Sequence, residues 1–232
     1  VEVSGVLYTL HGDATIHKIV IATGVTSTVA GEAGIYGNTD GLGIRARFGT
    51  NPRELAYRDG VLYVADCGSF GAGSENSAIR RIDIVEPYTV STFAGSGTQG
   101  FLDGASNVAQ FQYLAGNLIC DTSGNLYVPD RNNHRIRKIT SGGVVTTLAG
   151  NGTATSVDGV GTNATFNGPV AVAFDPTGSV LYVCEITGQR VRRIDIATAT
   201  VTLLAGSGSS GTADGTGTNA TFYLPQDIST DS

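Results

Sequence analysis

The side chains of this chain that could transfer protons or form ion pairs recur in a fixed order along the sequence. An acidic residue precedes an arginine in three places: Asp66 with Arg80, Asp130 with Arg137, and Glu185 with Arg192. An exposed carboxylate–guanidinium pair on neighbouring strands contributes about 0–1 kcal/mol to stability. We expect these pairs to lie on the surface and to join the strands of a hairpin. The pattern therefore predicts a structural role and no catalytic residue.

Near the N-terminus, His11 and His17 stand at the two positions that the acid and the arginine hold elsewhere. Two imidazoles across a hairpin can bind a transition metal, which makes these residues the metal candidates of the sequence. The chain has 3 histidines, and the third, His134, belongs to a different repeat. Since no pattern brings three ligands together, we expect ordinary surface histidines, with no metal centre and no bound cofactor.

Other motifs for catalysis or ion binding are weak in this sequence. No GxSxG, HExxH or phosphate-binding loop occurs, so we expect no enzymatic activity. The segment 157–166 contains Asp158 but lacks the several carboxylates that calcium prefers. We expect the aspartate to fix a turn and the following glycine to adopt special backbone angles. Ala164 and Phe166 are expected to pack between repeats.

Four markers recur in one register along the chain and define an internal repeat. Ala-Gly dipeptides end at Gly31, Gly95, Gly150 and Gly206, which are 64, 55 and 56 residues apart. The other markers are an Asp-Gly pair, a phenylalanine and the tyrosine of a Leu-Tyr pair. Their positions are Asp40, Asp103, Asp158 and Asp214; Phe48, Phe111, Phe166 and Phe222; and Tyr8, Tyr63, Tyr127 and Tyr182. Each repeat is therefore one structural unit of the same kind.

Each repeat predicts four short strands joined by tight turns. In the best-preserved repeat the expected strands are residues 117–121, 125–130, 135–140 and 144–148. A Gly-Gly pair at 142–143 suits a tight hairpin. Four-stranded antiparallel sheets in tandem are typical of a β-propeller, so the expected fold class is all-β.

The segments 124–130, 133–139 and 144–150 closely resemble the NHL-repeat consensus, including its Asn-His pair. The resemblance covers essentially the whole chain and is sharpest in the third repeat. It implies a β-propeller of four-stranded antiparallel blades, of which about four are present. It also brings in a less favoured alternative, a metal-dependent lyase-like enzyme, because the family includes a peptide-amidating lyase with histidine-bound zinc.

The expected organisation is a single propeller domain over residues 1–232. Its blade units are residues 1–31 completed by 225–232, then 51–95, 114–150 and 169–206. Two architectures stay open. In a closed four-bladed ring, residues 225–230 supply the inner strand of the first blade. In an arc of a larger propeller, the blades belong to a ring that usually has six in this family.

One loop of the second repeat is longer than its counterparts. Asp66 and Ile82 are 16 residues apart, whereas the equivalent residues of the next two repeats are 9 apart. A lengthened loop on a rigid scaffold is a candidate contact site, although surface insertions are also tolerated without a function. The interaction-loop candidates are Phe70, Glu75 and Asn76.

Three Asn-x-Thr sequons begin at Asn151, Asn163 and Asn219, all in connections between blades. Glycans at these positions would be exposed, which favours a secreted or cell-surface glycoprotein over a cytoplasmic protein. The net charge of −6 disfavours general nucleic-acid binding. No apolar run is long enough to span a bilayer.

We therefore expect a non-catalytic extracellular interaction or scaffold module that binds a protein partner or itself, as in a larger secreted or surface assembly. The alternative is an intracellular propeller that binds protein or RNA. The arginines of the third strands recur around the rim and do not cluster on one face, which disfavours RNA.

Overall fold

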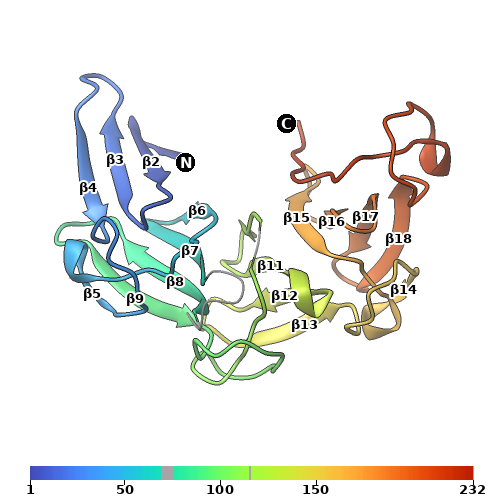
Figure 1. Cartoon of the computed structure of the whole chain (residues 1–232), viewed down its shortest axis with the longest axis horizontal. Coiled ribbons are helices and arrows are strands. Elements are labelled where there is room, and N and C mark those ends of the chain that lie inside the picture. The colour runs from blue at the N-terminus through green and yellow to red at the C-terminus, as the bar shows by residue number, and fades with distance from the viewer. Residues whose placement is uncertain (69–75, 115, 232) are drawn as a thin grey trace. The chain divides into compact units, whose positions relative to one another are not determined.

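The computed structural model describes residues 1–68, 76–114 and 116–231. The chain divides into two compact units, Val1–Leu114 and Ala115–Ser232. Each unit holds two antiparallel sheets (Figure 1). Where the sequence predicts one domain, two pairs of blades form separate units. Repeat arrays divide in this way because each repeat contacts its neighbours and not one shared core.

The first unit contains a four-stranded and a five-stranded sheet. The first sheet has the order β1-β2-β3-β4, with β1 (Glu2–Val3), β2 (Val6–Leu10), β3 (Ile16–Val20) and β4 (Thr26–Ala30). The second has the order β5-β9-β8-β7-β6, with β5 (Gly41–Leu42), β6 (Leu55–Arg58), β7 (Val61–Cys67), β8 (Ser77–Asp83) and β9 (Thr89–Ala94).

The second unit repeats this arrangement. Its first sheet has the order β10-β11-β12-β13, with β10 (Ile119–Cys120), β11 (Leu126–Asp130), β12 (Arg135–Ile139) and β13 (Val145–Ala149). Its second has the order β14-β18-β17-β16-β15, with β14 (Gly159–Val160), β15 (Pro169–Phe174), β16 (Val180–Glu185), β17 (Arg190–Asp195) and β18 (Thr200–Ala205).

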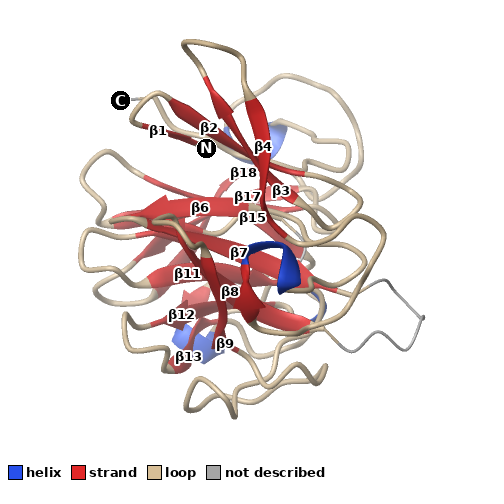
Figure 2. Ribbon diagram, turned by 90° about the vertical axis from the view of Figure 1, so that its left-hand side faces the viewer, coloured by secondary structure: helices blue, strands red, loops and turns tan. Residues whose placement is uncertain are grey.

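Helical structure in the described residues is confined to four 3-10 turns. These are η1 (Gly43–Arg45), η2 (Arg131–Asn133), η3 (Gly161–Asn163) and η4 (Gly217–Asn219). Figure 2, in which the first unit faces the viewer, shows strands and loops with only such short turns. In the part of the chain that the structure describes, no helix has the length and apolar character needed to cross a membrane.

The predicted fold class is confirmed, and the strands expected in the third repeat match β10 to β13 closely. The connection between blades also forms strand pairs, which the sequence did not suggest. After β4 and after β13 it pairs with the outer strand of the following blade, as β5 with β9 and β14 with β18. These pairings turn two of the expected four-stranded sheets into five-stranded ones.

The inner edge of the first sheet is formed inside its own unit. Glu2 pairs with Leu7 and Val3 with Val6, so β1 occupies the place that the ring architecture gave to residues 225–230. Residues 225–231 contain no strand. In the second unit this segment lies against β15, where the Thr230 hydroxyl donates to the Phe174 carbonyl at 2.8 Å.

Each unit has an apolar core, and its inner strands β7, β11 and β15 are buried on consecutive residues. In the first unit Ile16, Phe48 and Leu62 are completely buried, and in the second unit Phe166 and Leu181 are. The phenylalanines come from the connections between blades, so each connection contributes to the core as well as to the sheet edge. This placement confirms the expected packing of Phe166 between repeats.

Candidate functional site

The three arginines singled out in the sequence are the largest fully buried side chains of the described residues. Arg80, Arg137 and Arg192 each have 0% exposed side-chain surface, as have their acidic partners Asp66, Asp130 and Glu185. The N–O distances are 3.0 Å for Arg80–Asp66, 2.6 Å for Arg137–Asp130 and 3.5 Å for Arg192–Glu185. The pairing is confirmed, but the expectation that the pairs are exposed is wrong.

An irregularity in each sheet occurs at the arginine. The pairing of the third and fourth strands shifts register between Ile79 and Arg80, between Ile136 and Arg137, and between Val191 and Arg192. A bulge bends the strand and redirects the side chain beside it. The shift also occurs between Ile16 and His17 in the first blade. Each shift skips one residue of the fourth strand, such as Leu148, whereas the pairing of the second and third strands is continuous through the arginine. The bulge therefore lies on the strand beside the arginine.

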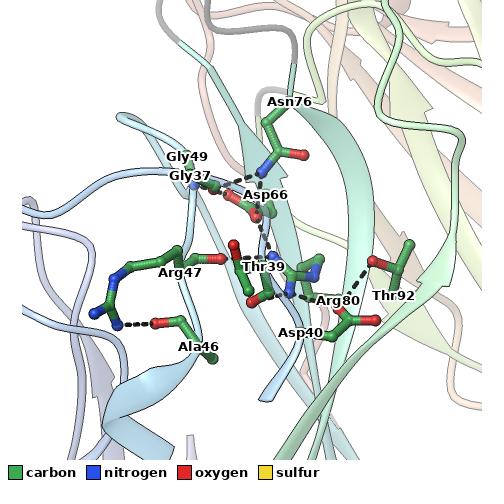
Figure 3. Close-up of polar contacts among 10 residues, drawn as sticks. All are labelled: Gly37, Thr39, Asp40, Ala46, Arg47, Gly49, Asp66, Asn76, Arg80 and Thr92. Atoms are coloured by element: carbon green, nitrogen blue, oxygen red, sulfur yellow. Dashed lines mark hydrogen bonds and ion pairs between the residues drawn. The ribbon is translucent and has the colours of Figure 1, made fainter.

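The connection before the second blade covers the arginine of that blade. Arg80 donates from Nη1 to the Arg47 carbonyl at 2.8 Å, and from Nη2 to the Thr39 carbonyl at 3.1 Å and to Asp40 Oδ1 at 2.8 Å (Figure 3). Its guanidinium lies 5.3 Å from the centre of the Phe48 ring. One side chain thus bonds its own blade and the connection that precedes it.

The acidic partner is held by further donors. Asp66 Oδ1 accepts the Gly49 amide at 2.7 Å, and Oδ2 accepts Asn76 Nδ2 at 2.5 Å (Figure 3). Burial raises the pKa of Asp66 to about 6, an effect larger than the attraction of Arg80 in the opposite direction. Burial also raises the pKa of Glu185, with Arg192 opposing it.

The same arrangement recurs in the fourth blade. Arg192 donates from Nη1 to the Thr165 carbonyl at 3.0 Å and from Nη2 to Asp158 Oδ1 at 2.6 Å. It lies 5.5 Å from the centre of the Phe166 ring. Glu185 Oε1 accepts the Asn167 amide at 2.8 Å. Two connections therefore hold the arginine of the next blade through one carboxylate, one ring and backbone carbonyls.

The role of the Asp-Gly loops differs from the one expected. Asp40 and Asp158 bind the arginine of the following blade and do more than fix a turn. The glycine is required by close packing: a Cβ on Gly159 would lie 2.8 Å from the backbone of Asn163. Its φ is not in the left-handed region. The shared period of the Asp and Arg markers was the signal that could have revealed this contact.

The two metal candidates lie together but are bonded to threonines. The rings of His11 and His17 stack with centroids 4.3 Å apart. His11 Nε2 is 3.0 Å from Thr9 Oγ1, and His17 Nε2 is 2.9 Å from Thr15 Oγ1. Over residues 1–68, 76–114 and 116–231, no three His, Cys, Asp or Glu side chains converge in a way that could hold a metal.

His134 has a separate structural role. Its Nδ1 accepts the Gly168 amide at 3.1 Å, and burial, with help from nearby arginines, lowers its pKa. The neutral imidazole thus joins the loop of the third blade to the start of the fourth.

The interaction-loop candidates have different outcomes. Phe70 and Glu75 lie outside the described residues. Asn76 is buried, and its side chain donates to Asp66 and to the Gly37 carbonyl. The prediction that Asn76 is an exposed contact residue is therefore wrong, because its amide is needed to satisfy a buried carboxylate.

The sequon asparagines Asn151, Asn163 and Asn219 are all exposed. Asn163 and Asn219 end the turns η3 and η4, on the outward side of two equivalent connections. Glycosylation at these positions stays a prediction.

Comparison with known proteins follows from this architecture. No protein-family model matches the chain. It is 29% identical over 142 residues to NHL repeat-containing protein 2 of Bos taurus, covering 58% of this chain and 20% of that protein. It is 28% identical over 183 residues to Protein SUPPRESSOR OF QUENCHING 1, chloroplastic, of Arabidopsis thaliana, covering 76% and 16%. The repeats of this chain are similar to those of NHL repeat-containing protein 2. The chain spans a fifth or less of the length of these relatives.

Solved structures support the propeller fold. A structural-genomics protein of unknown function from Bacteroides thetaiotaomicron has a TM-score of 0.68 and 22% identity, with 98% of this chain and 52% of that chain covered. The nidogen/laminin complex contains a chain with a TM-score of 0.60 and 16% identity, covering 99% and 65%. At these identities the likeness concerns the fold alone.

The first connection between blades has an exposed apolar surface. Leu42 and Ile44 are 49% and 61% exposed. Their equivalents are Val160 and Thr162 in one later connection, and Thr216 and Thr218 in another. Both residues line a groove of about 540 Å³, which we call the rim groove; the other residues lining it are Thr28, Val29, Gly43, Glu86, Pro87 and Tyr88. This surface is the candidate functional site of the first unit.

Proposed function

We propose that this chain is a non-catalytic interaction module that binds a protein partner through the rim groove. The observation that carries the proposal is the exposure of Leu42 and Ile44 beside a groove, with Ile44 at a position where the two later connections place threonine. Exposed apolar side chains that gather at one place on a rigid surface are typical of protein-binding sites. Propellers of the NHL type generally mediate protein interactions.

The fixed walls of the groove support this proposal. The Gly43 amide donates to the Tyr88 carbonyl at 2.7 Å, so the connection is bonded to the next blade at the groove. Lys18 Nζ donates to Tyr88 Oη at 2.6 Å and to Glu86 Oε1 at 3.1 Å. A partner would meet a surface that is already ordered, which reduces the entropy lost on binding.

We propose no catalytic activity because the ionisable side chains that could transfer protons are already bonded to other groups of the protein. Asp66 and Glu185 are bonded to buried arginines inside their blades. The two stacked histidines are bonded to threonines. The same burial removes Arg80, Arg137 and Arg192 from any RNA-binding surface, which weakens the RNA-binding alternative.

An extracellular or cell-surface location is proposed from the sequons. Asn163 and Asn219 occupy the position that Arg45 holds in the first connection, next to Ile44. Glycans there would cover the rim of the second unit and leave the rim groove of the first unit open. The two units would then differ in what they can bind.

Site-specific photo-cross-linking tests the binding proposal. A benzophenone amino acid at position 44 should cross-link a protein partner in extracts of the source, whereas the same group at Thr162 should not. The double variant Leu42→Thr/Ile44→Thr should lose at least about tenfold in affinity for the captured partner. Its melting temperature should stay within about 2 °C, since both side chains are exposed. Equal cross-linking from positions 44 and 162 would contradict the proposal.

Self-association and glycosylation need their own measurements. Sedimentation of the wild type and the double variant over a range of concentrations shows whether the partner is a second copy of the chain. The intact mass of protein from its natural source, before and after removal of N-glycans, tests the location. Unmodified asparagines at all three sequons would remove the support for secretion.

A further inference from the structure

The connection after the fourth blade, residues 206–224, has the fold of the connection that holds Arg192. A parallel bridge joins Ser210 to Phe222, as another joins Ala154 to Phe166. The Ala213 amide donates to Thr221 Oγ1 at 2.8 Å, as the Val157 amide donates to Thr165 Oγ1 at 2.9 Å. The Gly206 and Gly150 amides donate to Gly217 and Gly161 in the same way. The two connections are therefore the same structure built twice.

The fourth connection differs in one respect. Asp158 and Phe166 receive Arg192, but the equivalent residues Asp214 and Phe222 contact no arginine within residues 116–231. Asp214 is exposed, and Phe222 is half-buried where Phe166 is completely buried. The neighbouring Tyr223 is 68% exposed. The Asp214 carboxylate, the Phe222 ring and the Tyr223 side chain are thus accessible on one face, which we call the terminal face.

We propose that the terminal face binds a β-blade that presents an arginine from its third strand. The geometry around Arg80 and Arg192 specifies the ligand chemistry twice: a carboxylate accepts the guanidinium, a ring lies under it, and a backbone carbonyl accepts its remaining donors. A planar guanidinium fits such a set of acceptors, whereas a lysine ammonium would leave part of it unused.

The first blade of this chain does not present this group. It holds His17 at the arginine position, where the imidazole stacks on His11 and bonds to Thr15. A second copy of the chain would present the same histidine. The occupant that matches the terminal face is therefore a further blade of this repeat type, on the same polypeptide, with arginine at that position. This inference does not depend on the rim groove.

Two repeat-equivalent aspartates give the first test. Asp158→Ala leaves Arg192 without its carboxylate from the connection, so the melting temperature should fall by about 4–8 °C. Asp214→Ala in the same chain should change it by less than about 2 °C, because no arginine is bound there. An equal loss from both variants would show that this chain already fills the terminal face, and would overturn the proposal.

An extended chain gives the second test. Asp231 occupies the repeat position of Asp175, so a copy of residues 176–224 joined directly after Asp231 supplies strands for one more blade in phase. In this extended chain, Asp214→Ala should now lower the melting temperature as Asp158→Ala does. Arg192→Met in the appended copy alone should have a similar effect, and the two changes together should be less than additive.

Hydrogen exchange completes the experiment. Amides of the appended blade should be protected in the extended chain and should lose protection with Asp214→Ala. An appended blade that exchanges like unfolded polypeptide, or one insensitive to Asp214, overturns the proposal. An association of the unextended chain that appears on acidification and is abolished by His17→Ala would assign the terminal face to the first blade instead, which also overturns it.

Discussion

Arg192 and Asp158 are 34 residues apart in sequence, and Nη2 of the arginine donates to Oδ1 of the aspartate at 2.6 Å. The arginine belongs to the fourth blade, and the aspartate belongs to the connection that enters it. The equivalent contact, between Arg80 and Asp40, has a length of 2.8 Å. A single contact type therefore couples each of these connections to the blade that follows.

The buried arginine should be costly to truncate. Arg192→Ala leaves Glu185 buried without its cation, and such a loss destabilises a protein by about 3–5 kcal/mol. Replacing both residues, as Arg192→Met/Glu185→Met, should recover most of this loss because no buried charge is left unpaired and Asp158 is half-exposed to solvent. Chemical denaturation measures both values, with Arg193→Ala on the same strand as the control. A double variant as unstable as Arg192→Ala would show that the pair has a further role.

The close approach at Gly159 should not tolerate a methyl group. A Cβ there would lie 2.8 Å from the carbonyl carbon and oxygen of Asn163, so the backbone of η3 must move. Gly159→Ala should cost about 1–3 kcal/mol. Gly142→Ala in the same unit is the matched control, since its Cβ would meet only the Thr140 hydroxyl at 3.9 Å. Equal stability of the two variants, measured by urea denaturation, would refute this role of Gly159.

The three cysteines should differ in reactivity. Burial, reinforced by Asp227 and Glu185, raises the pKa of Cys184 to about 12, so its thiolate is scarce at neutral pH. Cys67 is buried and its thiol donates to the Leu114 carbonyl at 2.9 Å. Cys120 is only half-buried. Iodoacetamide at pH 7.5 should therefore modify Cys120 first, and peptide mapping would detect the order. Labelling of Cys184 before Cys120 would contradict it.

The pH dependence of stability should carry a contribution from Asp66. Its pKa is about 6 in the folded protein and near 3.9 when unfolded, so between these values the folded state holds the extra proton. The contribution of this carboxyl to the free energy of unfolding therefore decreases as pH rises from about 4 to 6. Urea midpoints of the wild type and Asp66→Asn across this range isolate the effect, expected at about 1–3 kcal/mol. A wild type that instead gains stability relative to Asp66→Asn would mean that the attraction of Arg80 exceeds the effect of burial.

Much of the fold could be predicted from the sequence because the same local pattern of strands and turns occurs in each repeat. The strands of the third repeat follow from short apolar runs and glycine-containing turns, which are local signals. The pairing of Asp130 with Arg137 also followed, because diagonal neighbours on adjacent strands of one hairpin lie within reach of a long side chain. The burial of the arginines did not follow, because it depends on connections that reach Arg80 and Arg192 from earlier in the chain.

The amino-acid sequence by itself determined the all-β class, the NHL-type repeat and the partners within each hairpin. Only the tertiary structure decided that the arginines are buried, that Asp40 and Asp158 bind the next blade, and that Asn76 supports Asp66. It also decided which repeat markers are left open, as at Asp214 and Phe222. The physical reason is range: turns and strand pairs form between neighbours in sequence, whereas burial of a charge depends on a connection that returns from another blade to supply its acceptors.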